Sequence, residues 1–512
     1  MRKDMHVEVM EQGTSARSKL PIVLFFLAIF LYLYVFHTQI HPVYIFSGDD
    51  WTYMSRGREA IPSMKEWDPA RIFPETVMPT VASFAVYFVK PIVGDYLLSL
   101  SVTYAGFLSL VVTVYVFSVY RLMKTLFALS DLQAGVVSTV YLFFHYYCFA
   151  SLDAENLHLL YVYDLANVFY YMMPTLTNLI LLLLLQKAEQ RGSRVFRNPL
   201  LKGLFFFFLY IALFSHLYCS YLLALYAFLY LIKDLMAGKR GGARFSLRGW
   251  ARKNALYFVI LAGFLISVFM EGGGTRAGNM PEKSSPFPLA ETVTILFRRL
   301  YYVKKSFLLV TVIIFVAAFC LHYREVRRGE AEDMLFEELK QILVLNAAAL
   351  FLSLLYIILL STVSNPNYVK RMDVLFGPMF FLLTGVVSAL SYILKKQSQV
   401  IAIIPLALFI GASTIWSIDG RTFRGNENPK GWIALENYHI QQFVEADQAG
   451  AEKVTLDLVD IYEESWFGDR IAITLYKHGI VSRRMKVETH VEPELKERFH
   501  LRPPLMPWAE DG

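Results

Sequence analysis

The first apolar block of the chain, residues 20–36, reads LPIVLFFLAIFLYLYVF and carries no charged side chain. A helix of about 20 such residues crosses the roughly 30 Å of hydrocarbon in a bilayer. Because lipid-facing backbone has to satisfy its own hydrogen bonds, the block is predicted to be a helix. Its far end carries Tyr32, Tyr34 and Phe36 instead of a small-residue cleavage site, which predicts an uncleaved first span rather than a signal peptide.

The composition of the whole chain agrees with this interpretation. Of its 512 residues, 56% are hydrophobic and 18% are charged, whereas about a quarter are charged in a soluble domain. The net charge of +6 comes from loops between apolar blocks, where membrane orientation explains it and nucleic-acid binding is not indicated. The three cysteines, Cys148, Cys219 and Cys320, all lie in apolar blocks, so we predict neither a disulfide nor a cysteine metal site.

Similar apolar blocks recur along the chain, so the sequence predicts an all-α polytopic membrane protein with about eleven spans. A weaker block at 76–93 is interrupted by Pro79, Lys90 and Pro91. It is predicted to lie on the membrane surface or to re-enter the membrane, with a true span as the alternative. The predicted spans are 20–36, 97–118, 133–151, 169–186, 203–217, 219–234, 255–270, 306–322, 342–361, 375–393 and 399–416.

The distribution of basic residues predicts the orientation of these spans. Lys and Arg concentrate in alternate loops such as 187–202 and 239–253, whereas the loop 152–168 has none. Under the positive-inside rule the basic segments are cytoplasmic. The prediction is a cytoplasmic N-terminus at 1–19, a membrane domain at 20–416 with a first outer loop at 37–96, and an extracytoplasmic lobe at 417–512.

Two further features follow from the pattern of polar and apolar residues. Residues 203–234 are flanked by basic clusters on both sides, which predicts a hairpin of two short helices turning near Ser215 and His216. Such short helices line a cavity or pack on protein, so we expect a cavity that opens to the outer face. The polar tail predicts a small α/β lobe, with a helix near 432–449, a strand near 453–459 and a helix near 469–478.

An acidic pair follows the first span, within Ser47-Gly48-Asp49-Asp50-Trp51. A carboxylate close to hydrocarbon usually has a function or a partner. Two acids beside an indole at the mouth of a membrane cavity can supply a general base. The alternative is that Asp49 or Asp50 caps a helix that starts at this point.

Basic residues at three predicted outer sites run against the orientation rule. Arg71 lies close to Glu75, Arg276 follows a run of three glycines, and Lys370 and Arg371 precede a late span. Arginine forks suit phosphate, and backbone amides in a glycine run approach an anion closely. The sites are therefore candidates for binding a phosphate-bearing lipid. Contact with lipid headgroups is the alternative.

The second outer loop carries polar residues without a balancing cation. They are Asp153, Glu155, His158 and Asp164. A metal or sugar site and ordinary solvated loop charges both fit this composition. His216, at the predicted hairpin turn, is either a polar group lining the cavity or a structural histidine.

The order of these features resembles that of the GT-C superfamily of membrane glycosyltransferases. Within it the chain is most similar to the bacterial glucosyltransferase group that includes the serotype-converting O-antigen glucosyltransferases. The glycine run departs from the Pro-Gly-Asn form associated with that group. The likeness rests on Gly48-Asp49-Asp50-Trp51, Arg71-Ile72-Phe73-Pro74-Glu75, Tyr170-Tyr171-Met172-Met173-Pro174, Gly274-Thr275-Arg276 and the segment 366–371.

The resemblance implies a GT-C-like fold and a reaction. A sugar would pass from a polyprenyl-phosphate donor to a glycan or lipid acceptor on the outer face, with inversion of its configuration. Asp49 or Asp50 would be the catalytic base. No cofactor is predicted, and the resemblance leaves a divalent cation, Mg²⁺ or Mn²⁺, open. Candidate donor-phosphate ligands are Arg276, Lys370, Arg371 and Arg71, and further candidates for substrate contact are Trp51, Glu75, Glu155, His158, Tyr171 and His216.

Three other classes of protein stay open at this point. A transporter or flippase of lipid-linked sugars would also need a cavity and phosphate-binding arginines, although two related halves are not recognisable here. An O-antigen ligase or polymerase would share the donor class. A non-catalytic membrane assembly factor would not need the acidic pair. The resemblance and the lack of Asn-x-Ser/Thr sequons predict a bacterial cytoplasmic membrane location.

Overall fold

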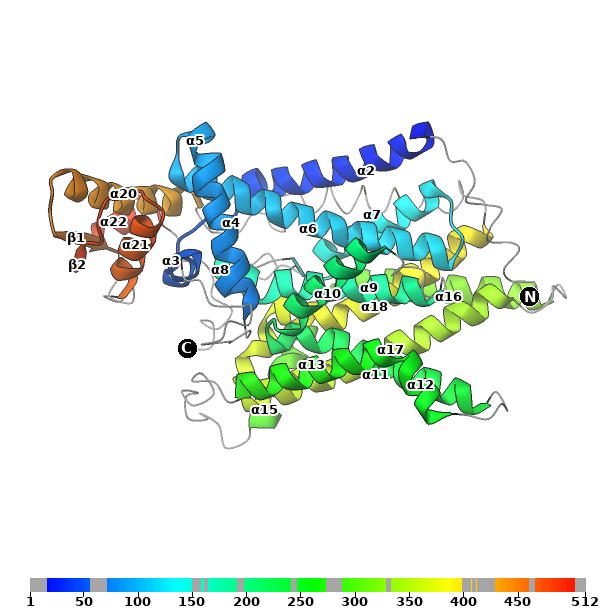
Figure 1. The fold of residues 1–512 in the computed structure, drawn as a ribbon. Coiled ribbons are helices and arrows are strands. Elements are labelled where there is room, and N and C mark those ends of the chain that lie inside the picture. The colour runs from blue at the N-terminus through cyan, green and yellow to red at the C-terminus, as the bar shows by residue number, and fades with distance from the viewer. Residues whose placement is uncertain are drawn as a thin grey trace.

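The computed structural model describes residues 16–55, 71–149, 158–160, 164–190, 198–240, 246–272, 288–327, 333–397, 407, 411, 429–459 and 466–501. Long helices lie side by side in a bundle, and a smaller group of helices with two strands sits at one end of it (Figure 1). Helix α2 (Ala16–Val35) begins at the end of the bundle that is far from this smaller group.

The helical elements of the described residues follow one another along the chain, and the two strands lie near its C-terminal end. The remaining bounds are η1 Phe36–Ile40, α3 Gly48–Ser55, η2 Phe73–Val77, α4 Met78–Phe84, η3 Ala85–Val89, α5 Lys90–Val93, α6 Tyr96–Leu126, α7 Asp131–Tyr147, α8 Leu165–Asn167, η4 Val168–Met172, α9 Met173–Gln190, α10 Pro199–Leu213, α11 Leu217–Arg240, α12 Leu247–Lys253, α13 Ala255–Gly272, α15 Pro288–Leu300, α16 Lys305–Arg327, α17 Met334–Val363, η6 Pro366–Lys370, α18 Met372–Lys396, α20 Pro429–Gln448, β1 Lys453–Leu458, α21 Trp466–Lys477, β2 Lys486–Val491 and α22 Glu494–Arg498.

Within the described residues, nine helical runs are long and apolar enough to cross a membrane. The chain is therefore a multi-pass membrane protein with an all-helical membrane part. The nine runs are Lys19–Ile40, Phe73–Val93, Tyr96–Leu126, Leu165–Glu189, Leu217–Gly238, Ala255–Gly272, Lys305–Arg327, Met334–Val363 and Met372–Lys396.

The predicted span 399–416 falls outside the described residues except at 407 and 411. The block around 76–93 forms a continuous helical run, Phe73–Val93, that is long enough for a true span. The structure corrects one prediction about the hairpin, because only α10, with 15 residues, is short. Its second half, α11, has 24 residues and is long enough to cross.

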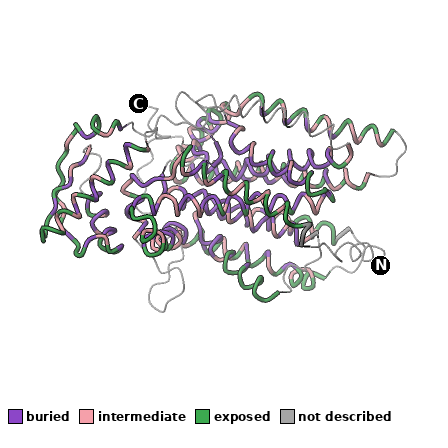
Figure 2. The backbone as a smooth tube through the Cα atoms, turned by 90° about the horizontal axis from the view of Figure 1, so that it is seen from above, coloured by how far each residue is buried: buried purple, intermediate pink, exposed green. Residues whose placement is uncertain are grey.

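The helices divide into central and peripheral ones. Helix α18 packs against α7, α16 and α17 and is buried along most of its length. Buried segments, drawn in purple, gather inside the bundle (Figure 2). Helix α2 instead exposes large apolar side chains such as Leu24, Leu27 and Leu31. A row of this kind on a membrane helix faces lipid, since lipid tails are as apolar as leucine.

The smaller group of elements contains a two-stranded parallel sheet. Strand β1 pairs with β2 in the register Lys453↔Lys486 to Leu458↔Val491. Helix α20 packs on β1, and α21 packs on β2 and on α3. A Cβ atom at Gly468 would lie 2.5 Å from a methyl of Val487, so glycine permits the close approach of α21 to the sheet. Helices α20 and α21 and strand β1 lie where helix, strand and helix were predicted, whereas β2 was not predicted.

Candidate functional site

The acidic pair lies in the first turn of α3, and the structure gives its two members different surroundings. The Asp50 side chain is fully buried. Its Oδ2 accepts the backbone N–H groups of Phe46 and Ser47, both at 3.2 Å, and its Oδ1 accepts the N–H of Ala166 at 2.7 Å. Asp50 therefore ties the loop before α3 to the start of α8, and its oxygens are already occupied by backbone donors.

Asp49 precedes it on the same turn but is exposed. Consecutive positions on a helix point about 100° apart, so one faces the protein and the other faces outward. Only Asp49 of the two is accessible to a substrate. The sequence left the roles of the two acids open, and the contacts of Asp50 match the structural alternative.

Asp164 is a third acid at the same place. Its carboxylate caps α8, accepting the N–H of Asn167 at 2.6 Å and that residue's side-chain amide at 2.9 Å. Burial raises the pKa of Asp164 to about 7, with Asp49 and Asp373 raising it and the N–H of Asn167 and Arg371 opposing them. Burial and the adjacent Asp164 carboxyl also raise the pKa of Asp50, against its three backbone donors.

A buried ion pair at the start of α18 faces these acids. The Arg371 guanidinium donates through Nε to Asp373 Oδ1 at 3.0 Å and through Nη2 to Asp373 Oδ2 at 2.6 Å. It lies over the ring of Tyr171, 4.1 Å from the centroid. The bidentate pair commits one edge of the guanidinium to Asp373 and balances its charge, so only the Nη1 side is left for a ligand.

Aromatic rings continue from Tyr171 along one side of the site. The ring of His216 lies 4.8 Å from that of Tyr171 and is stacked at 5.5 Å on that of Tyr218. The Tyr218 hydroxyl is within hydrogen-bonding distance of the hydroxyls of Ser361 and Ser364, at 2.8 and 2.9 Å. These contacts join the hairpin turn to the end of α17.

Arg71 forms a second bidentate pair, with Nε and Nη2 donating to Glu271 at 3.3 and 3.2 Å. Tyr170 and Glu75 interact with it electrostatically. Glu75 itself is buried. Arg71 thus joins the segment before the Phe73–Val93 helix to the end of α13. Two of the three nitrogens of its guanidinium are already hydrogen-bonded to Glu271.

A cavity of about 40 Å³ adjoins Asp164 and is also lined by His37, His41 and His158. Burial together with His41 and His37 lowers the pKa of His158, so its imidazole is neutral near pH 7. A cavity of this size has room for water molecules and not for a sugar ring.

Trp51 contacts the C-terminal elements of the chain. Its indole is fully buried, and Nε1 donates to Glu436 Oε2 of α20 at 3.0 Å. The Thr474 hydroxyl of α21 donates to the Trp51 carbonyl at 2.7 Å. Trp51 therefore forms a contact between α3 and the C-terminal elements, and its predicted contact with substrate stays a prediction.

The structure brings together many of the candidate residues from distant parts of the sequence. Glu155 and Arg276 lie outside the described residues. Asp373, Glu271, Glu436 and His439 were not predicted. Glu271 and Glu436 have partners that are remote in sequence, whereas Asp373 lies two residues from Arg371 and was recognisable as its possible partner. Asp164 interacts with Asp49, Asp50 and Arg371, and it lines one cavity with His158. Arg371 in turn contacts Tyr171, whose ring lies against that of His216, and Lys370 precedes Arg371 in the chain. Arg71 and Glu75 both interact with Tyr170.

Comparison with known proteins adds no relative. No protein-family model matches the chain, and neither a curated protein nor a solved structure is significantly similar to it.

Proposed function

We propose that this protein is a membrane glycosyltransferase that transfers a sugar from a polyprenyl-phosphate donor to a glycan or lipid acceptor on the outer face of a bacterial cytoplasmic membrane. The observation that carries the proposal is the acid cluster at α3, in which an exposed Asp49 stands on a helix that buried Asp50 fixes. Arg371 faces that cluster across Asp164.

In the proposed reaction Asp49 is the general base. Its carboxylate takes the proton of the acceptor hydroxyl as that oxygen attacks the anomeric carbon of the donor sugar. The bond from that carbon to the phosphate oxygen breaks, and the lipid phosphate leaves with the electron pair. Attack from the face opposite the leaving group inverts the configuration.

The leaving phosphate needs positive charge that is fixed before the reaction begins. Arg371 is held by Asp373 and by the ring of Tyr171. In the proposal its remaining edge and Lys370 contact the phosphate, with Arg276 and Arg71 as further candidates. The order of the short sequence motifs, which resembles that of the GT-C group, supports the same assignment.

The proposal is tested by transfer of radiolabelled sugar from polyprenyl-phosphate donors to a panel of envelope acceptors by purified protein in detergent. Transfer that depends on Asp49 supports it. Movement of lipid-linked sugar across proteoliposomes that is unaffected by Asp49→Asn would replace it with the transporter hypothesis.

Glu436 is expected to position α3 through Trp51. In Glu436→Leu the buried indole N–H loses its acceptor, which destabilises the protein by about 1–3 kcal/mol. Transfer should fall with a larger change in kcat than in KM, since α3 carries Asp49. Glu436→Gln keeps an acceptor oxygen for the indole N–H and should retain much of the stability. Glu445→Leu, at an exposed position of the same helix, is the control and should change neither property.

The raised pKa of Asp164 predicts a pH dependence of stability. The folded protein holds a proton at this carboxyl up to about pH 7, whereas an unfolded chain releases it near pH 4. Stability from this group is therefore full below pH 4 and lost as the pH rises through about 7. In Asp164→Asn the decrease in melting temperature between pH 5 and pH 8 should be smaller by about 2–4 °C.

A matched control is Asp447→Asn. Hydrogen bonds from Ser482 lower the pKa of Asp447, so this group stays ionised from pH 5 to pH 8 and its replacement should leave the slope unchanged. An unaltered slope in Asp164→Asn would contradict the assignment of the proton to Asp164.

A further inference from the structure

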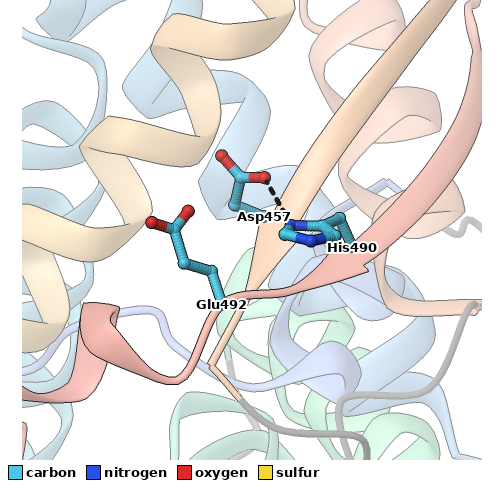
Figure 3. A group of neighbouring side chains, drawn as sticks. All are labelled: Asp457, His490 and Glu492. Atoms are coloured by element: carbon cyan, nitrogen blue, oxygen red, sulfur yellow. Dashed lines mark ion pairs between the residues drawn. The ribbon is translucent and has the colours of Figure 1, made fainter.

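Three potential metal ligands meet at the C-terminal end of the two-stranded sheet, far from α3 in the sequence. Asp457 lies on β1, His490 lies opposite it on β2, and Glu492 follows two residues later (Figure 3). Paired residues in a parallel sheet and residues two apart on one strand share a face. The Glu492 N–H donates to the Leu458 carbonyl at 2.8 Å, so the ladder continues to this residue and holds its direction.

The distance between the facing side-chain atoms of Asp457 and His490 suits two ligands of one metal ion better than a direct hydrogen bond. Asp457 Oδ1 and His490 Nδ1 are 3.4 Å apart, beyond the usual range of roughly 2.7–3.2 Å for an N–H···O bond. Two ligands of a tetrahedral Zn²⁺, each at 2.0–2.1 Å, lie about 3.4 Å apart. One ligand atom from each of the three residues lies within 4.8 Å of the others, so rotation of the Glu492 side chain completes the set.

The carboxylate of Asp457 is oriented by groups outside the set. Its Oδ2 accepts the Tyr438 hydroxyl at 2.8 Å and the Gln442 side-chain amide at 2.7 Å. Both donors come from α20 and lock the carboxylate with Oδ1 turned toward His490. Metal sites use such outer hydrogen bonds to fix the direction of a ligand.

We infer that Asp457, His490 and Glu492 form a binding site for a first-row divalent metal ion, with Zn²⁺ as the best fit. One imidazole and two carboxylates favour Zn²⁺ over Mg²⁺ and Ca²⁺, which prefer oxygen ligands alone. Asp457 and Glu492 are half-buried and His490 is exposed, so the ion reaches the site from solvent and keeps at least one open position for water.

The site is connected to α3 through α20. The Asp457 carbonyl lies 2.9 Å from His439 Nε2, and His439 Nδ1 lies 3.6 Å from Glu436 Oε2, which accepts the indole N–H of Trp51. A metal that clamps β1 to β2 would stiffen the strand against which His439 is held. The inference does not depend on the proposed transferase activity.

The test uses the full chain in detergent, without a polyhistidine tag and after removal of metals with EDTA. Titration calorimetry with Zn²⁺ should show one site, and Co²⁺ should give the visible absorption of a low-coordinate ion. His490→Ala and Glu492→Gln should each weaken Zn²⁺ binding by at least about tenfold. Both positions lie at the edge of the sheet, so these variants keep the interactions of Asp457 with α20.

His500→Ala is the matched control, since it removes another exposed imidazole from the same group of elements. It should bind Zn²⁺ as the parent does. The inference is overturned if the stripped parent binds no Zn²⁺, or if His490→Ala and Glu492→Gln bind it with unchanged affinity. Millimolar Ca²⁺ or Mg²⁺ that displaces equimolar Zn²⁺ would equally overturn the choice of metal.

Discussion

Replacement of Asp49 by asparagine is expected to lower the rate of sugar transfer by about 10²–10⁴-fold, the usual contribution of a general base. Asparagine has nearly the same shape but cannot accept a proton at neutral pH. Because Asp49 is exposed, the substitution alters the surface of the protein and not its core, and such changes usually shift stability by less than about 0.5 kcal/mol. Donor binding and the melting temperature should therefore stay close to those of the parent, and the loss should appear in kcat.

Asp50→Asn provides the contrasting result. Asp50 accepts three backbone N–H groups, and an amide in its place turns a donor toward some of them. We expect a clear loss of stability, accompanied by a loss of transfer that follows the fraction of folded protein. Asp469→Asn, at an exposed acid in the first turn of α21, is the control for Asp49 and should have no effect. Full activity in Asp49→Asn would rule out the proposed base.

Arg371→Met should be among the most destabilising substitutions in the protein. It leaves the Asp373 carboxylate buried and without its bidentate partner, close to the carboxyl of Asp164. Breaking a buried ion pair on one side typically destabilises by about 3–5 kcal/mol. Unfolding in mixed micelles measures the change. Lys453→Met breaks an exposed pair with Glu488 and should leave stability nearly unchanged.

A double variant separates the structural role of Arg371 from its proposed role at the phosphate. Arg371→Met combined with Asp373→Leu removes both charges and should recover most of the lost stability, as buried pairs replaced by apolar groups often do. If Arg371 contacts the donor phosphate, the stable double variant still fails to transfer sugar and binds the donor weakly. Recovery of transfer together with stability would show that Arg371 serves only to hold the fold.

The position of the acidic pair could be predicted from the sequence, but the different surroundings of Asp49 and Asp50 could not. Its position after the first span identified a candidate site, because charged groups near hydrocarbon are rare for physical reasons. Which acid is exposed depends on the direction of a short helix and on the N–H of Ala166, which lies over a hundred residues away. Similarly, Arg71 was recognisable as an unusual outer cation, but Glu271, two hundred residues away, became its partner only through packing.

The sequence by itself determined that the chain is a helical, multi-pass membrane protein, since the length and apolarity of a span are local properties of the chain. It also located the approximate positions of the long apolar helices, the turn at Ser215 and His216, and two helices and a strand of the tail. Only the tertiary structure decided that α11 is long, that Trp51 is buried against Glu436, and that β1 and β2 bring Asp457 beside His490. Those features arise from contacts between distant segments, and no local pattern of residues encodes them.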